Sequence, residues 1–370
     1  MTVRIIVGDV RDKLRELADA SVHCCVTSPP YFGLRDYGTG QWQGGDTGCD
    51  HSRFLGGNGL ASAKQVSSGG TQKYQYISDC GKCGATRIDS QIGLEATPDA
   101  YVAELVAVFR EVRRVLRNDG TVWLNLGDSY ASGGTGGTSD KSKLHGGLGV
   151  GPTEKIKQGP IISRKPSECL KPKDLIGIPW RVAFALQADG WYLRQDIIWS
   201  KPNPMPESVT DRCTKAHEYM FLLSKSARYY FDAEAIAEVS AYPGDNRAER
   251  TDTRKLIDPF CQDNGSRART GSPTGDTRNK RSVWEVASQP FSEAHFATFP
   301  PALIEPCIKA GCPAGGMVLD PFGGAGTTGL VADRLGRNAV LIELNPEYAA
   351  LAERRIHADA GLFASLEMVI

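Results

Sequence analysis

Apolar residues follow two patterns along this chain. Short continuous apolar runs bounded by glycine, proline or polar residues are typical of strands buried in a sheet. Between these runs, apolar residues recur at helical spacing, and Thr97-Pro98 supplies an N-cap followed by a proline in the first helical position. Strands separated by helices predict an α/β fold with a doubly wound, mostly parallel sheet. The pattern predicts strands at residues 4–7, 22–26, 121–126, 193–199, 218–223, 317–319 and 339–344, and helices at 10–17, 98–116, 179–188, 301–310, after a glycine turn at 323–326, and from 346.

Three segments lack this periodicity. Residues 41–90 are rich in glycine, serine and glutamine, residues 131–173 in glycine, serine and lysine, and residues 240–282 are polar. Two of these segments are basic: residues 131–173 hold eight Lys/Arg against three Asp/Glu, and residues 241–281 hold nine against six. Such segments are either solvated loops or surfaces that contact nucleic-acid phosphates, and the charge leaves both interpretations open.

The overall composition narrows the class of protein. With 370 residues, 41% of them hydrophobic, the chain can form one large domain with insertions or two domains. Its 43 Lys/Arg balance 43 Asp/Glu, so the net charge does not indicate a nucleic-acid partner. Asp9 follows the first apolar run too closely for a signal peptide, and no run approaches the roughly 20 residues of a membrane span. We therefore expect a cytoplasmic protein whose ten cysteines are thiols or metal ligands.

A rigid turn follows the second predicted strand and reads Thr27-Ser28-Pro29-Pro30-Tyr31. Both prolines fix φ and lack an N–H group, so the carbonyl groups of this turn have no local donors and can face a ligand. A hydroxyl group and an aromatic ring flank the prolines. The turn therefore suits the binding of a flat ring that carries an amine.

A glycine-rich turn lies near the other end of the chain, in Asp320-Pro321-Phe322-Gly323-Gly324-Ala325-Gly326-Thr327-Thr328. It joins a strand to a helix, and its glycines allow the backbone to approach a ligand closely. The turn has neither the lysine of a P-loop nor the G-x-G-x-x-G spacing. About twenty residues later an apolar run ends in Glu343, where a Rossmann-like fold places the carboxylate that binds ribose hydroxyls. Asp9, after the first strand, is a candidate for the adenine end of the same ligand.

The two motifs, with Glu343-x-Asn345-Pro346 after the second, resemble those of the β group of S-adenosylmethionine-dependent DNA amino-methyltransferases. In that group the catalytic motif precedes the cofactor motif, and residues 199–203 and 217–219 resemble its later catalytic motifs. The resemblance implies a circularly permuted, Rossmann-like fold with a mostly parallel seven-stranded sheet and irregular insertions. It implies S-adenosyl-L-methionine as cofactor and double-stranded DNA as partner. The resemblance assigns catalysis to Ser28, Pro29, Pro30 and Tyr31, and cofactor binding to Asp9, Thr27, Asp320, Pro321, Phe322, Gly323, Gly324, Gly326, Thr327, Glu343 and Asn345.

The chemistry of an exocyclic base amine fits the first motif. Such an amine is conjugated with its ring and becomes nucleophilic when its N–H groups donate to acceptors while the methyl donor lies in line. The Ser28 hydroxyl and the Pro29 carbonyl are the predicted acceptors, and Tyr31 can stack on the ring. The base must leave the duplex to reach this pocket.

Methylation of cytosine C5 would instead need a nucleophilic cysteine. Pro306-Cys307 is a candidate pair, but it lies inside a helical pattern, and Cys24 and Cys25 lie in a predicted buried strand. An amine target needs no covalent step. We therefore predict a core position for these cysteines and no catalytic role.

Several target classes stay open. Within the resembled family, a serine in the first motif favours N4 of cytosine, whereas an aspartate favours N6 of adenine. RNA or protein amino-methyltransferases and an inactive DNA-binding relative are alternatives, although the motif order and the intact motifs count against them. The same motif order places the target-recognition region before Phe299, at residues 236–290.

Cys49, His51, Cys80 and Cys83 lie inside the irregular insert. A Cys-x-x-Cys pair followed by glycine forms a knuckle, and a Cys-x-His pair completes the four N/S ligands that a tetrahedral zinc ion prefers. Because the insert has few apolar residues, a structural zinc would explain how it folds. We expect the cofactor pocket, built from the other end of the chain, to be independent of this metal site.

These expectations give a domain organisation. Residues 1–40 and 91–235 form the catalytic half of the methyltransferase domain, 41–90 a zinc-binding insert, 131–173 a mobile basic loop, 236–290 the target-recognition region and 291–370 the cofactor-binding half. A homodimer and a cognate restriction endonuclease are compatible with this organisation.

Overall fold

The computed structural model describes residues 1–33, 37–49, 51, 79–131, 170–240, 276–289, 298–360 and 365–369. The predicted mobile basic loop therefore lies almost entirely outside the described residues, as does most of the predicted target-recognition region.

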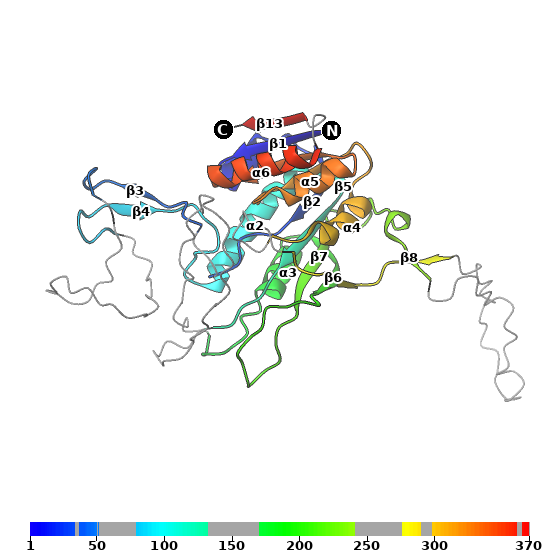
Figure 1. Cartoon of the computed structure of the whole chain (residues 1–370), viewed down its shortest axis with the longest axis horizontal. Coiled ribbons are helices and arrows are strands. Elements are labelled where there is room, and N and C mark those ends of the chain that lie inside the picture. Colours follow the sequence, from blue (N-terminus) through cyan, green and yellow to red (C-terminus); the bar gives the residue numbers. More distant parts are fainter. Residues whose placement is uncertain are drawn as a thin grey trace, which may run out of the picture.

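A single large sheet organises the described part of the chain (Figure 1). It has nine strands in the order β10-β6-β7-β5-β2-β11-β12-β1-β13. Only β7 runs antiparallel to its neighbours β5 and β6, so the sheet is mostly parallel, as predicted. The strands are β1 (Thr2–Val7), β2 (Val22–Thr27), β5 (Leu116–Leu126), β6 (Tyr192–Ser200), β7 (His217–Ser224), β10 (Val283–Glu285), β11 (Met317–Asp320), β12 (Asn338–Glu343) and β13 (Ser365–Val369).

The prediction of seven strands holds for the centre of this sheet and misses its edges. The seven predicted strands occupy the adjacent positions from β6 to β1, and the short strands β10 and β13 extend the sheet on either side. β10 (Val283–Glu285) and β13 (Ser365–Val369) mix apolar and polar residues, so neither forms a continuous apolar run. β5 also begins earlier than predicted, at Leu116, because the expected turn at Asp119-Gly120 is instead an irregularity in its pairing with β2.

Helices cover both faces of the sheet, which makes it doubly wound (Figure 1). Side chains of α1, α2 and α3 contribute to one buried cluster, and side chains of α4, α5 and α6 to another. In β5, Leu124 belongs to the first cluster and the adjacent Trp123 to the second, as expected from the alternation of side chains along a strand. The helices are α1 (Val10–Lys13, continued by the 3₁₀ turn Leu14–Glu16), α2 (Pro98–Val115), α3 (Ile178–Ala188), α4 (Pro301–Gly311), α5 (Thr327–Arg334) and α6 (Pro346–Ala360).

Helix α2 begins as its sequence predicts. The Thr97 hydroxyl accepts a hydrogen bond from the Ala100 backbone N–H at 3.1 Å, and Pro98 occupies the first turn. None of the described helices is long and apolar enough to cross a membrane.

Two short antiparallel pairs lie outside the main sheet. β3 (Gln41–Gln43) pairs with β4 (Thr86–Ile88) in the predicted insert and projects to one side of the molecule (Figure 1). β8 (Glu238–Val239) pairs with β9 (Thr277–Arg278) at the two described ends of the predicted target-recognition region. That region is not wholly separate from the main domain, because its last part forms β10 of the main sheet.

Candidate active site

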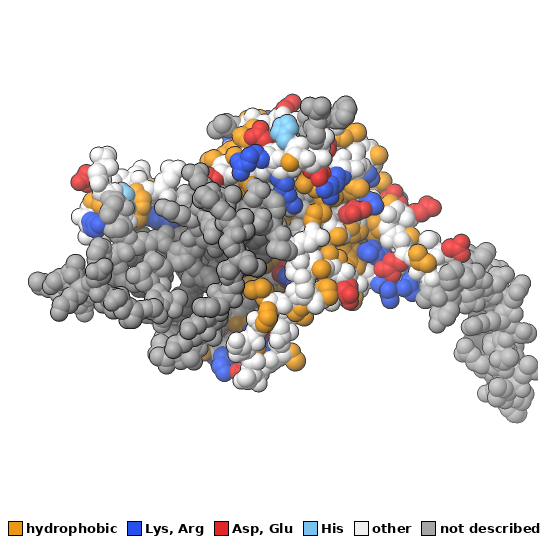
Figure 2. Space-filling model, viewed as in Figure 1, with side chains coloured by type: hydrophobic (Ala, Val, Ile, Leu, Met, Phe, Trp, Pro, Cys, Tyr) orange, Lys and Arg blue, Asp and Glu red, His pale blue; other side chains and the backbone are white. Residues whose placement is uncertain are grey.

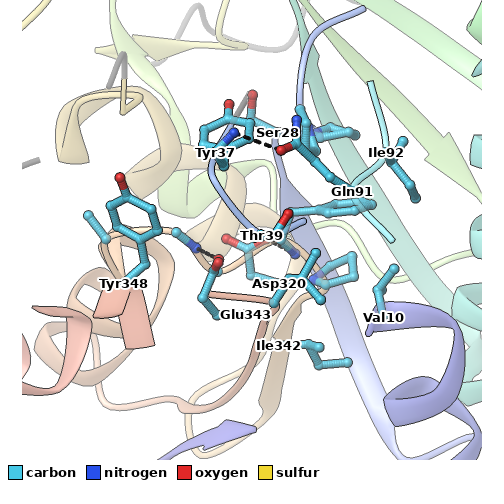
Figure 3. Close-up of a pocket in the computed structure, with 18 of the residues that line it drawn as sticks. Val10, Ser28, Tyr37, Thr39, Gln91, Ile92, Asp320, Ile342, Glu343 and Tyr348 are labelled. Atoms are coloured by element: carbon cyan, nitrogen blue, oxygen red, sulfur yellow. Dashed lines mark hydrogen bonds between the residues drawn. The ribbon is translucent and has the colours of Figure 1, made fainter. Parts of the chain in front are cut away.

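One pocket brings the two sequence motifs together at the carboxyl ends of β1, β2, β11 and β12. The Ser-Pro-Pro-Tyr turn leaves β2, and the glycine-rich turn leaves β11, which pairs directly with β2. Parallel strands place their carboxyl ends at one edge, where α/β folds bind ligands. The pocket is lined by Gly8, Asp9, Val10, Ser28, Pro29, Pro30, Tyr31, Tyr37, Thr39, Ser90, Gln91, Ile92, Thr298, Phe299, Asp320, Pro321, Phe322, Gly323, Gly324, Ala325, Thr327, Ile342, Glu343, Leu344 and Tyr348 (Figure 3).

Asp320 is a buried acid at the end of β11. Its carboxylate accepts hydrogen bonds from the Thr27 and Thr328 hydroxyls, both at 2.6 Å, and from the Phe322 N–H at 3.1 Å. Burial raises the pKa of Asp320 to about 6, against the lowering effect of these hydrogen bonds. The carboxylate thus holds the glycine-rich turn against β2.

Glu343 ends β12 and faces the pocket (Figure 3). Its carboxylate accepts from the backbone N–H groups of Gly324 and Asn345, each at 2.8 Å. Burial raises the pKa of Glu343 to about 7. The Leu344 backbone N–H also stabilises the charged form, and at least one lone pair stays available for a further donor such as a ribose hydroxyl.

Gly324 gives the glycine-rich turn its open face. Its φ of +51° lies in the left-handed region, and a Cβ placed there would meet only the Phe322 carbonyl oxygen, at 3.9 Å. The backbone at Gly324 is therefore free to approach a ligand. Gly326 has a different reason for its glycine: with φ +76° it precedes α5, and a Cβ would lie 2.8 Å from Cβ of Ala352.

The structure separates the predicted cofactor residues into two groups. Three of them do not line the pocket. Thr27 is fully buried and supports Asp320, Gly326 packs on α6, and Asn345 accepts from the Glu347 N–H at the start of that helix. Asp9 does line the pocket, but Arg11 binds its carboxylate at 2.6 and 2.9 Å, so it is less free than predicted. The predicted residues that line the pocket are Asp9, Asp320, Pro321, Phe322, Gly323, Gly324, Thr327 and Glu343.

All four residues of the predicted catalytic turn line the same pocket. The Ser28 hydroxyl lies 3.2 Å from Asn125 Oδ1, and the Tyr31 hydroxyl donates to Glu218 at 2.6 Å. The Pro30 carbonyl accepts from the Tyr101 hydroxyl at 2.8 Å, which corrects the expectation that both proline carbonyls face a ligand. Among the described residues, no donor reaches the Pro29 carbonyl, so it can still accept from one.

Sequence reasoning missed one wall of the pocket. Tyr37, Thr39, Ser90, Gln91 and Ile92 line it from the two roots of the β3–β4 hairpin. The Tyr37 N–H donates to the Gln91 side chain at 2.7 Å (Figure 3). The Thr39 hydroxyl donates to Asp89, also at 2.7 Å. These residues carry no motif, and only the fold brings them to the cofactor side. The insert therefore supplies one wall of the pocket, whereas the sequence predicts a pocket built from the other end of the chain.

The four predicted metal ligands lie together. Their ligand atoms are all within 4.8 Å of one another, although the chain separates the Cys-x-His pair from the Cys-x-x-Cys pair. The sulfurs of Cys49 and Cys80 are 3.8 Å apart, and Cys83 Sγ is 3.5 Å from His51 Nδ1. These cysteines are free thiols, so no disulfide holds the group. A hydrogen bond from His51 and the backbone N–H groups of Cys83 and Lys82 lower the pKa of Cys80, which favours the thiolate that binds metal.

The remaining cysteines singled out in the sequence are core residues. Cys24, Cys25 and Cys307 are fully buried, and Cys307 lies within α4. Burial raises the pKa of each thiol well above its ordinary value. None of these thiols lines the pocket, so a cysteine nucleophile is absent from its lining.

The described part of the predicted target-recognition region is less basic than its composition suggests. Arg278, Lys280 and Arg281 all pair with Glu238, at 3.5, 3.8 and 3.0 Å. Basic and acidic side chains accordingly lie together near β8 (Figure 2). These three cations are engaged in ion pairs at the end of the segment. Contact with DNA phosphates would compete with these pairs.

Comparisons with known proteins agree with this geometry. A family model described as DNA methylase, of the N6/N4 type, matches residues 22–354. The type II methyltransferase M.SmaI of Serratia marcescens is 41% identical over 355 residues, covering 95% of this chain and 90% of the relative. M.Cfr9I of Citrobacter freundii is 40% identical over 353 residues, covering 95% and 87%.

Two solved structures share the fold. A putative DNA modification methylase of Thermus thermophilus, solved in complex with S-adenosyl-L-methionine, superposes with a TM-score of 0.52 at 21% identity over 100% of both chains. The cytosine-N4-specific PvuII DNA methyltransferase gives a TM-score of 0.53 at 15% identity, over 96% of this chain and 87% of the other. At these identities the similarity concerns the fold alone.

Proposed function

This chain belongs to the family of S-adenosylmethionine-dependent DNA amino-methyltransferases, and we propose that it methylates N4 of cytosine in duplex DNA. The observation that carries the proposal is that the neutral hydroxyl of Ser28 lines the pocket, at the motif position where the resembled family favours serine for cytosine and aspartate for adenine. The proposed target base is flipped out of the duplex into the pocket.

The proposed chemistry needs acceptors rather than a nucleophile from the protein. S-adenosyl-L-methionine supplies an electrophilic methyl group when bound. Ser28 Oγ and the Pro29 carbonyl accept the two N–H groups of the cytosine amine, which shifts its lone pair out of conjugation and toward the methyl group. Tyr31 borders the same space and contacts the base ring.

The proposed cofactor contacts follow from the free groups of the pocket. The Glu343 carboxylate holds the ribose hydroxyls, and the open backbone at Gly324 lies against the methionine part. Phe322, which belongs to the glycine-rich turn, also packs against the cofactor. Asp320 holds the turn in place through Thr27 and Thr328.

We also propose that Cys49, His51, Cys80 and Cys83 hold one structural zinc ion. Zinc–sulfur bonds of about 2.3 Å and zinc–nitrogen bonds of about 2.0–2.1 Å in a tetrahedron separate two sulfurs by about 3.8 Å, and sulfur from nitrogen by about 3.6 Å. One sulfur–sulfur distance and one sulfur–nitrogen distance match these values, at 3.8 and 3.5 Å, and all four ligand atoms lie within 4.8 Å of one another. The His51 ring also stacks on Trp42 of β3, with 4.8 Å between ring centroids, which fixes its orientation. Four protein ligands leave no open position, so the proposed role is structural.

The cellular setting is a further part of the proposal. The relatives named above are type II methyltransferases, which supports a cognate restriction endonuclease that cuts the same unmethylated site. A cellular DNA substrate supports a cytoplasmic location. A homodimer stays compatible with these features, and size-exclusion chromatography with light scattering would decide it.

Expression in a methylation-deficient host tests the target base. Mass spectrometry of digested DNA should find N4-methylcytosine, and sequencing that detects modified bases should place it at one recognition site. N6-methyladenine would overturn the base assignment alone, whereas 5-methylcytosine would overturn the acceptor mechanism. The Ser28→Ala variant serves as the control for host background.

A further inference from the structure

A hydrogen-bonded chain runs behind the catalytic turn and across three strands. Ser28 follows β2, Asn125 lies at the carboxyl end of β5, and Glu218 lies at the start of β7. Lys201, directly after β6, forms a salt bridge with Glu218 in which both side chains are mostly buried, with 19% and 14% exposure. Asn125 is itself 1% exposed. None of Asn125, Glu218 and Lys201 lines the cofactor pocket.

The polarity of this chain is set from the Glu218 end. A carboxylate and a backbone carbonyl only accept hydrogen bonds, and Asn125 Nδ2 faces both: Glu218 Oε2 at 3.3 Å and the Tyr219 carbonyl at 3.0 Å. The NH₂ group of Asn125 must therefore point toward β7. Its Oδ1 atom then points toward the catalytic turn as an acceptor, so the orientation of the amide follows from its neighbours.

Ser28 is the next member of the chain. Its Oγ lies 3.2 Å from Asn125 Oδ1, which can only accept, so the serine hydroxyl donates its proton to Asn125. A hydroxyl has one proton and two lone pairs. With the proton directed at Asn125, the lone pairs of Ser28 are left for donors in the pocket.

Tyr31 is fixed by the same carboxylate. Its hydroxyl donates to Glu218 Oε2 at 2.6 Å. Burial and the adjacent Glu218 charge raise the pKa of Tyr31 well above its ordinary value, so the phenol keeps its proton and stays a donor. Glu218 therefore holds both side chains of the turn, one directly and the other through Asn125.

We propose that Glu218 and Asn125, with Lys201 as the counter-ion, are positioning residues that make Ser28 an obligate acceptor for the target amine. This inference rests on the proposed function, in which Ser28 accepts from that amine. If the amide were reversed, Asn125 would donate to Ser28, and the serine proton would turn into the pocket toward the N–H groups of the base. The serine O–H and a base N–H would then face each other as two donors. No hydrogen bond would form between them, and the amine would stay conjugated.

Exchange of the donor and the acceptor between positions 125 and 218 tests the direction of the hydrogen bonds in this chain. Asn125→Asp removes the donor to Glu218 and places two carboxylates together, and their repulsion moves the acceptor away from Ser28. Glu218→Gln removes the charge and presents an amide NH₂ that favours the reversed Asn125. In the double variant, the introduced amide donates to the introduced carboxylate, which again accepts from Ser28. Rescue stays partial, because that carboxylate also faces the Tyr219 carbonyl.

The readout is the single-turnover methylation rate on a DNA duplex carrying the recognition site, with cofactor affinity measured in parallel. Each single variant should lose about 100-fold in rate with unchanged cofactor affinity, because neither Asn125 nor Glu218 lines the cofactor pocket. The double variant should be at least about tenfold faster than the slower single variant. If the fold loss in rate of the double variant equals the product of the fold losses of the two single variants, the proposal is overturned.

Two further outcomes keep the test decisive. If Asn125→Asp does not fold, as shown by loss of cofactor binding, Glu218→Gln alone decides. A methylation rate of Glu218→Gln within about twofold of the wild type then overturns the proposal. If the wild type methylates no exocyclic amine, the proposed function fails. If it does and the variants show no rescue, only the polarity chain fails.

Discussion

The Gly324 backbone N–H donates to Glu343 Oε2 at 2.8 Å, across a sequence separation of 19 residues. This bond joins the glycine-rich turn after β11 to the acid that ends β12. The spacing of the two motifs therefore has a direct cause, since the strand between them must deliver the carboxylate to the turn. A change in the charge of Glu343 therefore alters a hydrogen bond that shapes the turn.

The charge of Glu343 should make cofactor binding depend on pH. Burial raises its pKa to about 7, and ribose hydroxyls donate best to the ionised form. Affinity for S-adenosyl-L-methionine should rise as the pH increases through about 7, with proton release on binding. Calorimetry in two buffers of different ionisation enthalpy measures both effects. Glu343→Gln should bind about 10- to 100-fold more weakly without this pH dependence, whereas the exposed neighbour variant Glu347→Gln should retain it.

The same group should make the cofactor-free protein less stable at higher pH. Its pKa is about 7 when folded and near 4.5 when unfolded, so the folded state binds the extra proton between these values. The resulting stability is complete below about pH 4.5 and is lost as the pH rises through about 7. Burial lowers the pKa of His23, which acts in the opposite direction in part of this window.

The difference between variants isolates this contribution. Urea unfolding at pH 5 and pH 8 should show that Glu343→Gln loses less stability over this interval than the wild type, by about 1.4 kcal/mol for each unit of the pKa shift. Asp320, with a pKa of about 6, should contribute with the same sign in Asp320→Asn. Parallel profiles for wild type and Glu343→Gln would contradict the assignment of a partly buried acid that is protonated below about pH 7.

Ser28→Ala should lose turnover while it keeps the cofactor. The change removes one of the two proposed acceptors of the amine and leaves Glu343 and the glycine-rich turn intact. We expect a loss of about 100-fold or more in the single-turnover rate. Ser21→Ala, at an exposed serine just before β2 begins, is the matched control. Equal rates for the two variants would remove Ser28 from catalysis.

Cys80→Ser should release the proposed zinc ion and also weaken the cofactor pocket. Elemental analysis should find one zinc per chain in the wild type and little in the variant, with new proteolysis between residues 44 and 90. Because the hairpin roots line the pocket, cofactor affinity should fall as well. The exposed Cys213→Ser variant should change neither.

The metal and cofactor results can be separated. Absence of stoichiometric metal in protein purified without chelator would overturn the zinc assignment. Loss of metal with unchanged cofactor affinity would instead restore the independence of the two sites. In that case the hydrogen bonds of Thr39 and Asp89 would hold the pocket wall without the metal.

The central strands, the Thr97 cap and the two turns of the pocket could be predicted, because each is determined by a local apolar pattern or a short motif. The sequence misses β13, which is held by its pairing with β1 rather than by its own apolar pattern. It also misses Gln91, because a segment without periodicity becomes part of the pocket only through the path of the hairpin. Asn125 did leave a signal: it is a polar residue in the apolar run Val122–Leu126, where burial demands a partner.

If residues 236–290 recognise the target, as the sequence predicts, the pairing of β8 with β9 lets that region diverge among related enzymes. Val239 lies opposite Thr277, so the chain leaves and rejoins the described structure at one point. Whatever sequence stands between these ends can change in length or be replaced as a cassette, provided that the two ends still meet. The sheet, the cofactor pocket and the chemistry would be inherited unchanged, while a new host–endonuclease pairing selects a new recognition sequence.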